Sequence, residues 1–438
     1  AWGAPAPAAW WTLFRNPALD ALMARAIAGH PSLDAQLAAI MQAEQQLAAV
    51  RGEQLPSAGL SLGAERATLN QYGYAAGPLG NYVSNFYSGA VKINYLLDLF
   101  GGRRRSIEGY QANLDYQRNL LDAAALSLTT SLGTAAINSA SLREQIAATD
   151  ALVANEEAQL AQIARRNALG GVSRGEVLRQ EAQVAATRAT LPALRQQLAL
   201  AEHLLAVLSN RAPADAEPSM LQLADFNLPA ALPVQLPSAM VEQRPDIRAA
   251  RAQLHQASAQ IGVAAAKALP SFMVSASYGK SSGKFHDLFS DSASGWSLLG
   301  GLTQPLFNGG ALSAERRAAE AAYRQAAAEY RLTVLNALQN VADALSQLDG
   351  DGDAVRLSAE QLRVAQASLD FTGKRYAAGA VDFNALLADQ QTYQRARIDL
   401  IRASARRKVD IVALFKALGG GWLDIKSSTD GSIAYHGQ

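Results

Sequence analysis

The stretch PSLDAQLAAIMQAEQQLAAVRGEQLPS, residues 31–57, reappears 214 positions later as PDIRAARAQLHQASAQIGVAAAKALPS, residues 245–271. The two stretches align without a gap, and both close on Leu-Pro-Ser at the same point. Self-similarity at such a distance is typical of a chain built from repeated structural units. The sequence therefore predicts two copies of one unit.

Two further pairs of motifs follow in the same order. DLFGG at 98–102 corresponds to PLFNGG at 305–310, and RRNALG at 165–170 corresponds to KRYAAG at 374–379. Between the copies, residues 211–237 contain five prolines, a density that excludes helix and central strand. We predict a first repeat at 1–210, an extended equatorial connector at 211–237, a second repeat at 238–422 and a tail at 423–438.

Each copy is predicted to begin with a helix, at 17–54 and 238–268, and to continue with two strands. The strands are predicted at about 57–68 and 86–100 in the first copy, and at about 271–279 and 295–307 in the second. Val91, Ile93 and Tyr95 alternate there with Lys92 and Asn94. Such period-two alternation predicts a sheet with one apolar and one polar face. Residues 69–85 and 279–295, rich in Gly, Ser, Asn and Tyr, are predicted to be loops.

After the second strand of each copy the helical pattern hardly stops. It runs over about 103–168 and about 311–377, and 66 residues of helix extend about 100 Å. Returning helices are predicted at 173–209 and 382–418. The result is two helical hairpins, at about 103–209 with its tip near 169–173 and at about 311–418 with its tip near 378–382. Pro192 is predicted to kink or divide the first returning helix.

Composition excludes several classes of protein. The formal net charge is +1, which argues against a nucleic-acid partner. There are no cysteines, and the five histidines are scattered, so no metal site, no cofactor and no catalytic residue is predicted. We find neither a phosphate-binding loop nor a nucleophile elbow and expect no enzyme. No apolar run of about 18 residues is apparent, so a membrane-spanning helix is not expected, whereas membrane β-strands are compatible with the pattern.

Four strands are too few to close a barrel, and an open sheet edge readily pairs with another strand. We therefore expect several copies of the chain to pool their strands, with the apolar face outward and the polar face lining a wet lumen. The competing interpretation is a soluble four-stranded sheet beside a coiled-coil scaffold, whose apolar face would need a covering helix.

Several motifs resemble those of one known family. They are WWTLFRNPAL at 10–19, QRPDIRAA at 243–250, PLFNGG at 305–310 and ALGGGW at 417–422, of which the second is the most specific. Together with the duplicated halves and the long helices, they make the chain similar to the TolC superfamily. Within it, the chain resembles the NodT-type outer-membrane lipoproteins of resistance-nodulation-division efflux pumps. The resemblance covers about residues 10–422.

The resemblance implies a mainly α-helical homotrimer with a 12-stranded transmembrane β-barrel, a long α-helical barrel and an equatorial domain. It implies a channel in the bacterial outer membrane that reaches into the periplasm and passively conducts drugs or other toxic small molecules outward. The implied partners are outer-membrane lipid, a periplasmic membrane-fusion adaptor and an inner-membrane transporter. A duct for type I protein secretion is the alternative. Family members usually carry a lipid on an N-terminal cysteine, which is expected to precede Ala1.

The resemblance also assigns functions to the two predicted hairpin tips. Small residues allow a tight reversal and close approach of another backbone, and in the family such turns receive the adaptor. A plain helix-ending turn is the other interpretation. The tip residues are Leu169, Gly170, Gly171 and Val172 in the first hairpin and Ala378, Gly379, Ala380 and Val381 in the second.

Channels of this family close through charged links near the tip and a ring of aspartates. Candidates here are Glu176, Arg375, Tyr376, Asp382 and Asp389. The position expected to carry the ring aspartate is Ala388, and the position of the arginine that links the two hairpins is Val381. The gate is therefore expected to be held by other pairs or more weakly. Alternatively, these charges are solvated tip residues that each contribute under about 1 kcal/mol.

Two other motifs have open interpretations. DGDGD at 349–353, followed by Glu360, has the spacing of a calcium loop, but Ala354 occupies the position that needs glycine. A local helix kink is the preferred interpretation. Arg103, Arg104 and Arg105 are consistent either with the periplasmic rim of a barrel or with a solvated helix start.

Overall fold

The computed structural model describes residues 9–73, 77–215, 221–227, 243–420, 425–427 and 433–435. For 69–73, 77–82, 425–427 and 433–435 it describes the backbone alone. Most of the predicted connector and tail lies outside the described residues. The chain forms two compact units. The helical unit comprises Ala1–Ala38, Arg118–Arg248 and Leu332–Gln438, and the sheet unit comprises Ala39–Gln117 and Ala249–Arg331. Each unit thus combines segments from both repeats.

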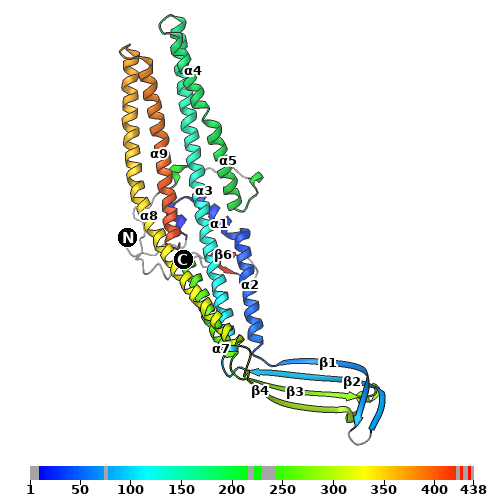
Figure 1. Cartoon of the computed structure of the whole chain (residues 1–438). Coiled ribbons are helices and arrows are strands. Elements are labelled where there is room, and N and C mark those ends of the chain that lie inside the picture. The colour runs from blue at the N-terminus through cyan, green and yellow to red at the C-terminus, as the bar shows by residue number, and fades with distance from the viewer. Residues whose placement is uncertain are drawn as a thin grey trace. The chain divides into compact units, whose positions relative to one another are not determined.

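The sheet unit contains a four-stranded antiparallel sheet in the order β1-β2-β3-β4 (Figure 1). The strands are β1 (Ser57–Gly73), β2 (Gly77–Leu97), β3 (Ser271–Ser282) and β4 (Ser294–Thr303). Two short 3₁₀ helices, η4 (His286–Phe289) and η5 (Asp291–Ala293), lie between β3 and β4. In this described sheet, β1 and β4 are the two edges, and neither pairs with another strand on its outer side.

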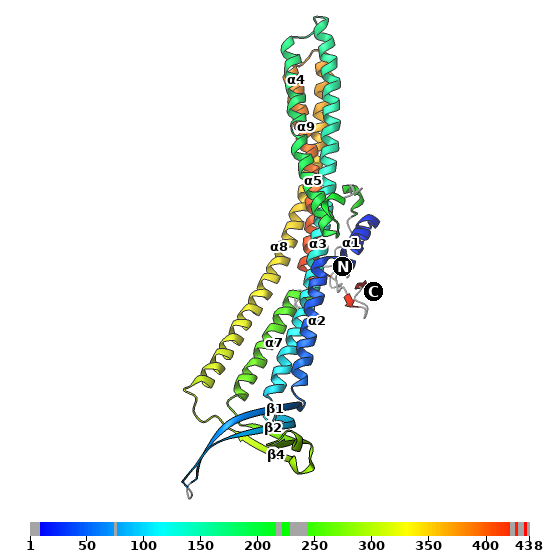
Figure 2. The ribbon, with the colours of Figure 1, turned by 90° about the vertical axis from the view of Figure 1, so that its right-hand side faces the viewer.

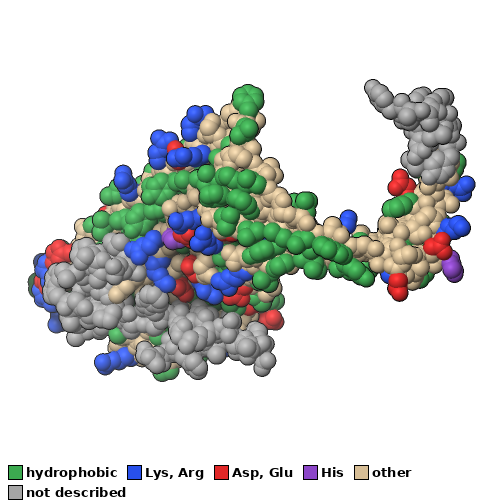
Figure 3. All heavy atoms as spheres, turned by 90° about the horizontal axis from the view of Figure 1, so that it is seen from below, with side chains coloured by type: hydrophobic (Ala, Val, Ile, Leu, Met, Phe, Trp, Pro, Cys, Tyr) green, Lys and Arg blue, Asp and Glu red, His purple; other side chains and the backbone are tan. Residues whose placement is uncertain are grey.

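The register separates the side chains of the sheet into an apolar and a polar face. One row across the four strands contains Leu60, Val91, Tyr278 and Trp296, which lie opposite one another. These side chains are exposed, and Trp296 retains 78% of its accessible surface. The next row contains Gly59, Lys92, Ser277 and Ser297 and points to the other face. Figure 3 shows hydrophobic side chains gathered along the sheet, an arrangement that suits contact with lipid.

The strand ends differ from the prediction at both ends of the sheet. β1 and β2 extend into the region predicted to be a loop and pair up to Gly73 and Gly77. β2 instead stops at Leu97, because Asp98 turns to accept the backbone N–H groups of Arg103 (3.1 Å) and Arg104 (2.9 Å) at the start of the next helix. Likewise β4 stops at Thr303 and not near residue 307.

The first predicted helix, 17–54, is wrong as a single element. The structure has α1 (Pro17–Gly29) and α2 (Pro31–Gly52), with His30 in an extended conformation between them. Pro31 lacks the N–H group that a continuous helix needs, and its ring disfavours helical backbone at the preceding residue. In the second repeat α7 covers Pro245–Ala266.

The long helices are α3 (Gly102–Ala168) and α8 (Ala311–Ala377), and each contributes residues to both units. α3 is followed by α4 (Arg174–Arg188) and α5 (Leu191–Leu208), which are separated just before Pro192, and α8 is followed by α9 (Phe383–Ala417). α8 continues as a helix through residues 349–353, where a calcium site would need a loop. Short elements complete the described chain: η1 (Trp10–Phe14), η2 (Pro213–Asp215), η3 (Leu223–Asp225), β5 (Ile425–Ser427) and β6 (Ile433–Tyr435).

One helix corrects the expectation that no apolar run is long enough to span a membrane. Among the described residues, α3 contains an 18-residue segment with a mean hydropathy of 1.4, and 56% of that segment is buried within the protein. Only the length and the amino-acid composition of α3 make this helix a candidate for a membrane span. The core helix of a protein passes the same test, so the segment is weak evidence for a span.

The helical unit is anchored by a cluster of aromatic side chains. Trp10 stacks on Phe415 with 5.7 Å between the ring centroids, and Phe14 meets Phe226 edge to face at 5.8 Å. All four are 2% exposed or less. The cluster joins η1, the segment after η3 and the end of α9, three parts of the chain that are far apart in sequence.

Arg244, from the motif QRPDIRAA, also has a structural role in this unit. Its side chain is buried and donates to both carboxylate oxygens of Asp246, at 3.0 and 2.7 Å. It also donates to the carbonyl oxygen of Ala417 at 2.7 Å, which satisfies a free acceptor at the end of α9.

We predict that Arg244→Lys lowers the free energy of unfolding by about 1–2 kcal/mol, because lysine keeps the charge but loses the two-pronged geometry. Thermal unfolding followed by circular dichroism measures the effect. Arg395→Lys, at an exposed position of α9, is the control. Equal changes for the two variants would contradict this role of Arg244.

Candidate functional site

The two hairpin tips of the helical unit have the same backbone structure. At the first tip the N–H of Gly171 bonds to the carbonyl of Arg166 (2.8 Å), and that of Gly170 bonds to the carbonyl of Asn167 (2.9 Å). At the second tip Ala380 and Gly379 make the matching bonds to Arg375 (2.8 Å) and Tyr376 (3.0 Å). This pattern closes a helix with a left-handed residue, and Gly170 and Gly379 have φ of 74° and 73°.

The returning helices begin with matching side-chain caps. Ser173 accepts the N–H of Glu176 at 3.3 Å, and Asp382 accepts the N–H of Ala385 at 3.0 Å. The small tip residues between helix and cap are exposed, and Leu169 retains 88% of its accessible surface. Val172 and Val381 are half-buried. Both tips therefore present backbone and small side chains to solvent.

Just behind the tips, an apolar cluster joins the two hairpins. Ile163 of α3 and Val177 of α4 pack with Phe383 and Leu386 of α9, and all four side chains are buried. Tyr376 of α8 borders this cluster, with its ring 5.7 Å from that of Phe383. The cluster fixes how the two hairpins meet at this level.

Tyr376 also makes a polar link between the hairpins. Its hydroxyl donates to the Oε2 atom of Glu176 at 2.9 Å, and the guanidinium of Arg166 lies 5.6 Å from the centre of its ring. Burial, together with the hydrogen bond to Glu176, raises the pKa of the Tyr376 hydroxyl above its ordinary value. The tyrosine therefore stays protonated and remains a donor.

The other three predicted gate residues make contacts within the second hairpin. Arg375 donates to the carbonyl of Ala380 at 3.4 Å and lies over the ring of Phe371. Asp382 caps α9, and Asp389 accepts the hydroxyl of Ser368 at 2.9 Å. Of the five candidates, the structure thus brings Glu176 and Tyr376 together across the hairpins. A gating role for Arg375, Asp382 and Asp389 stays a prediction.

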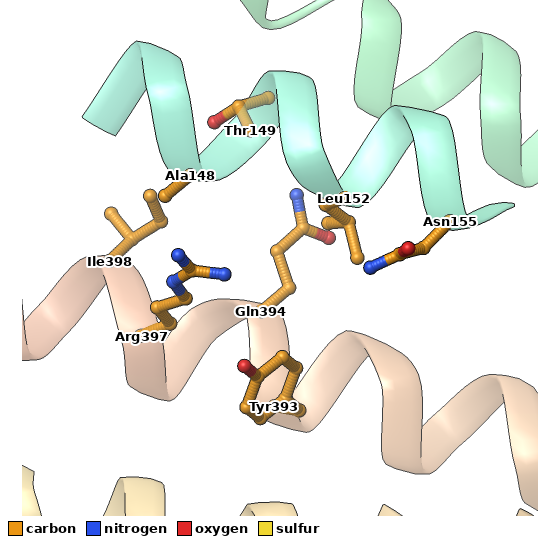
Figure 4. Close-up of a pocket in the computed structure, with 8 residues that line it drawn as sticks. All are labelled: Ala148, Thr149, Leu152, Asn155, Tyr393, Gln394, Arg397 and Ile398. Carbon is orange, nitrogen blue, oxygen red and sulfur yellow. The ribbon is translucent and has the colours of Figure 1, made fainter. Parts of the chain in front are cut away.

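α3 and α9 run alongside each other in the helical unit (Figure 2), and away from the tips the contact between them becomes polar. Gln390 donates to Gln159, and Arg402 donates to Gln145 at 3.0 Å. Figure 4 shows a small pocket between these two contacts, lined by Gln394 and Arg397 of α9 and by Thr149 and Leu152 of α3, in which Gln394 points toward α3 beside Leu152. We call this run of contacts, from Gln159 to Arg402, the polar seam.

A buried carboxylate supports the polar seam from the first hairpin. Glu156 is 1% exposed and accepts hydrogen bonds from Gln183 (3.0 Å) and Thr187 (3.2 Å). Gln183 in turn accepts the side-chain N–H of Gln391 from α9 at 2.9 Å. Burial raises the pKa of the Glu156 carboxyl. The chain Glu156–Gln183–Gln391 therefore connects α3, α4 and α9 through side chains alone.

The sequence analysis missed these glutamines and Glu156. Glutamine is common on exposed helix faces, and nothing in its spacing distinguishes a contact between hairpins from solvated surface. Only the alignment of α3 against α9 reveals the polar seam. Arg166 could have been found from the sequence, because the repeat aligns it with Arg375, the residue directly before Tyr376.

A pair of acidic side chains lies on α8 and α9. Asp351, which is buried, is hydrogen-bonded to Asp410. Burial and the neighbouring Asp351 raise the pKa of Asp410 from 3.8 to about 6. The folded state therefore holds this proton more tightly than the unfolded chain does, and the free energy of unfolding falls as the pH rises from about 4 to about 6.

We predict that Asp410→Asn raises the melting temperature at pH 7.5 and changes it much less at about pH 3, below both pKa values, where the aspartate is largely protonated in the folded and the unfolded state. Asp399→Asn, at an exposed position of the same helix, serves as the control. An equal shift at both pH values would show that the pair does not share a proton in the way described.

Comparison with known proteins identifies the fold and the family. A family profile described as "Outer membrane efflux protein" matches residues 22–211 and 236–420, which includes both repeats. The pyoverdine export outer membrane protein OpmQ of Pseudomonas aeruginosa is 31% identical over 424 residues, 94% of this chain and 87% of that protein. The toluene efflux pump outer membrane protein TtgF of Pseudomonas putida is 28% identical over 95% of this chain and 86% of its own.

Solved structures agree with the sequence relatives. The outer-membrane channel OprN has a TM-score of 0.90 and 26% identity, over 96% of this chain and 94% of that chain. The predicted TolC-like fold and the predicted location in the outer membrane are confirmed. With the profile covering both repeats, and with relatives and a channel structure aligned over nearly the whole chain, this protein belongs to the outer membrane efflux protein family.

Proposed function

We propose that three copies of this chain assemble into the exit duct of a tripartite efflux pump. The observation that carries the proposal is the four-stranded sheet, which has two free edges and an exposed apolar face. Three such sheets joined β4 to β1 make a closed barrel of 12 strands, in which each edge is paired. The apolar face then meets lipid and the polar face lines the lumen.

The hairpin tips form the gate of the proposed duct. Tyr376 and Glu176 are the latch between the hairpins, with Arg166 beside them. The polar seam supports this role, because side-chain amides that separate from one another regain hydrogen bonds from water at small net cost. An apolar seam would resist the same separation. Along the polar seam the second hairpin can therefore separate from the first at small cost, and the apolar cluster and the latch near the tips are what hold the gate closed.

The partners of the proposed duct are a periplasmic membrane-fusion adaptor and, through it, an inner-membrane transporter. The adaptor binds the exposed turns around Gly170 and Gly379, where its own helices approach the backbone closely. Pyoverdine and toluene appear in the names of relatives, and small molecules of this kind are the proposed cargo. Type I protein secretion is the less favoured alternative, since the family is named for efflux and these two relatives for the export of pyoverdine and toluene.

Adaptor docking is tested by adding bulk at a tip without straining the turn. Asparagine tolerates positive φ, so Gly379→Asn should keep the hairpin and obstruct the surface. We predict that the amount of adaptor recovered in a pull-down falls about tenfold, the equivalent of about 1.4 kcal/mol. Gly350→Asn, in α8 and with open space around it, is the control. Unchanged recovery with Gly379→Asn would contradict docking at this turn.

Duct activity itself is tested in planar lipid bilayers with the purified chain. A duct produces discrete conductance steps, and these become more frequent when the tip is unlatched. A chain that inserts without any conductance, with the latch intact or removed, would exclude the duct and favour a scaffold.

A further inference from the structure

One charged side chain lies in the middle of the polar face of the sheet. Lys92 of β2 has Gly59 of β1 on one side and Ser277 of β3 on the other. The row ends at Ser297 of β4, whose hydroxyl is 2.8 Å from that of Ser277. The two serines satisfy each other, and Gly59 has open space around it. Lys92 therefore projects from a row of small residues and is exposed.

Among the side chains of the sheet that the structure describes, Lys92 has no acidic neighbour on this face. No ion pair of Lys92 is found among the described side chains of the sheet unit. Arg66 and Lys280 lie in rows whose side chains point to the opposite, apolar face of the sheet. Glu65 shares the polar face but lies six residues along β1 from Gly59, about 20 Å away.

In strands that line the aqueous lumen of a membrane barrel, we expect charged side chains either to be paired with opposite charges or to be absent. A charged side chain without such a partner therefore indicates a function. A fixed charge on the wall of a channel bounded by lipid concentrates ions of opposite sign, because field lines are focused in the narrow aqueous space. At an ionic strength of 0.1 M this influence extends about 10 Å from the wall. Lys92 lies on the polar face, which lines the lumen of the proposed duct. No carboxylate among the described residues neutralises its charge.

We propose that Lys92 makes the barrel lumen select for anions, so that the duct favours cargo carrying carboxylate, phosphate or sulfonate groups. The inference rests on the proposed trimer, in which three copies place three lysines at one level of the lumen. Lys92 is a specificity-determining residue in this account. Its charge attracts anionic molecules and slows the passage of cationic ones, without any fixed binding site.

The absence of cysteine makes a direct test possible. Ser277→Cys places a single thiol opposite Lys92 in the register. The assembled protein in lipid vesicles is treated with two thiosulfonate reagents of similar size, one carrying a sulfonate and the other a trimethylammonium group. The measured quantity is the ratio of the two modification rates. A ratio is used because any effect of Lys92 on the thiol itself is common to both reagents.

In low salt we expect Lys92→Gln to reduce the ratio of the sulfonate rate to the trimethylammonium rate about fivefold. Half-molar salt should remove most of the difference between the proteins with and without the Lys92→Gln substitution. Lys280→Gln is the matched control, since it removes a lysine from the opposite face of the same sheet. This control should leave the ratio unchanged.

The outcomes separate the inference from the proposed trimer. If Ser277→Cys reacts readily in a trimer and Lys92→Gln leaves the ratio unchanged, Lys92 does not select for anions and the duct proposal stands. Ile93→Cys tests the barrel, because its side chain lies on the apolar face and lipid should protect it from both reagents. If Ile93→Cys reacts as fast as Ser277→Cys, the barrel is absent and both proposals fail.

Discussion

Tyr376→Phe should raise the open probability of the duct about tenfold in planar bilayers. The substitution removes one hydroxyl and with it the 2.9 Å hydrogen bond to Glu176. A hydrogen bond to a charged group contributes about 1.5–3 kcal/mol, and 1.4 kcal/mol corresponds to a factor of ten in an equilibrium. We take the lower end, because Tyr376 is only half-buried. The ring remains, so its contacts with Phe383 and Arg166 are kept.

Two variants make this prediction specific. Glu176→Gln keeps an acceptor but removes the charge, and it should open the duct less than Tyr376→Phe does. Tyr393→Phe is the matched control, since that tyrosine lies in the same hairpin beside the pocket of Figure 4. If Tyr376→Phe conducts like the unmodified protein, the bond to Glu176 does not hold the gate closed.

Phe415→Ala should give the largest loss of stability in the helical unit, about 3–5 kcal/mol. Phe415 is fully buried and stacks on Trp10 with 23° between the ring planes. Truncation leaves a cavity among Trp10, Phe14 and Phe226, which the surrounding helices fill only in part, and it removes the aromatic contact itself. For a chain of 438 residues the melting temperature should fall by roughly 3–5 °C.

Thermal unfolding in detergent measures this change. Phe371→Ala is the control, because Phe371 lies on the neighbouring helix α8 and is 61% exposed. We expect that variant to lose under about 1 kcal/mol. A comparable loss for both variants would mean that the aromatic cluster does not anchor the helical unit. Trp10→Ala should reproduce the effect of Phe415→Ala, since the two rings share one contact.

The parts of the fold that depend on periodic patterns were predictable from sequence. The alternation of Val91, Lys92 and Ile93 predicted the two faces of the sheet, and the unbroken helical pattern predicted α3 and α8 almost to the residue. Features that depend on one local contact were missed. The end of β2 is set by Asp98, which caps α3, and a capping aspartate resembles any other aspartate in the sequence.

The candidate site divides in the same way. The repeat located both tips, because Gly170 and Gly379 occupy matching positions and have nearly equal positive φ. Tyr376 and Glu176 came from a resemblance, and their contact required the packing of the second hairpin on the first. No sequence pattern predicted the polar seam, because its glutamines form a contact between hairpins only through the helix that lies opposite them.

The central claim is that three copies close one barrel by joining β4 of one to β1 of the next. The chain has no cysteine of its own, so paired cysteines along the two edges, beginning with Leu60→Cys and Leu298→Cys, are tested for disulfide formation in the membrane. We predict that some registers give covalent dimers and trimers and nothing larger. Single-cysteine controls should stay monomeric on the same gels. Registers that give only monomers, or ladders that extend beyond the trimer, would contradict the closed barrel of three chains.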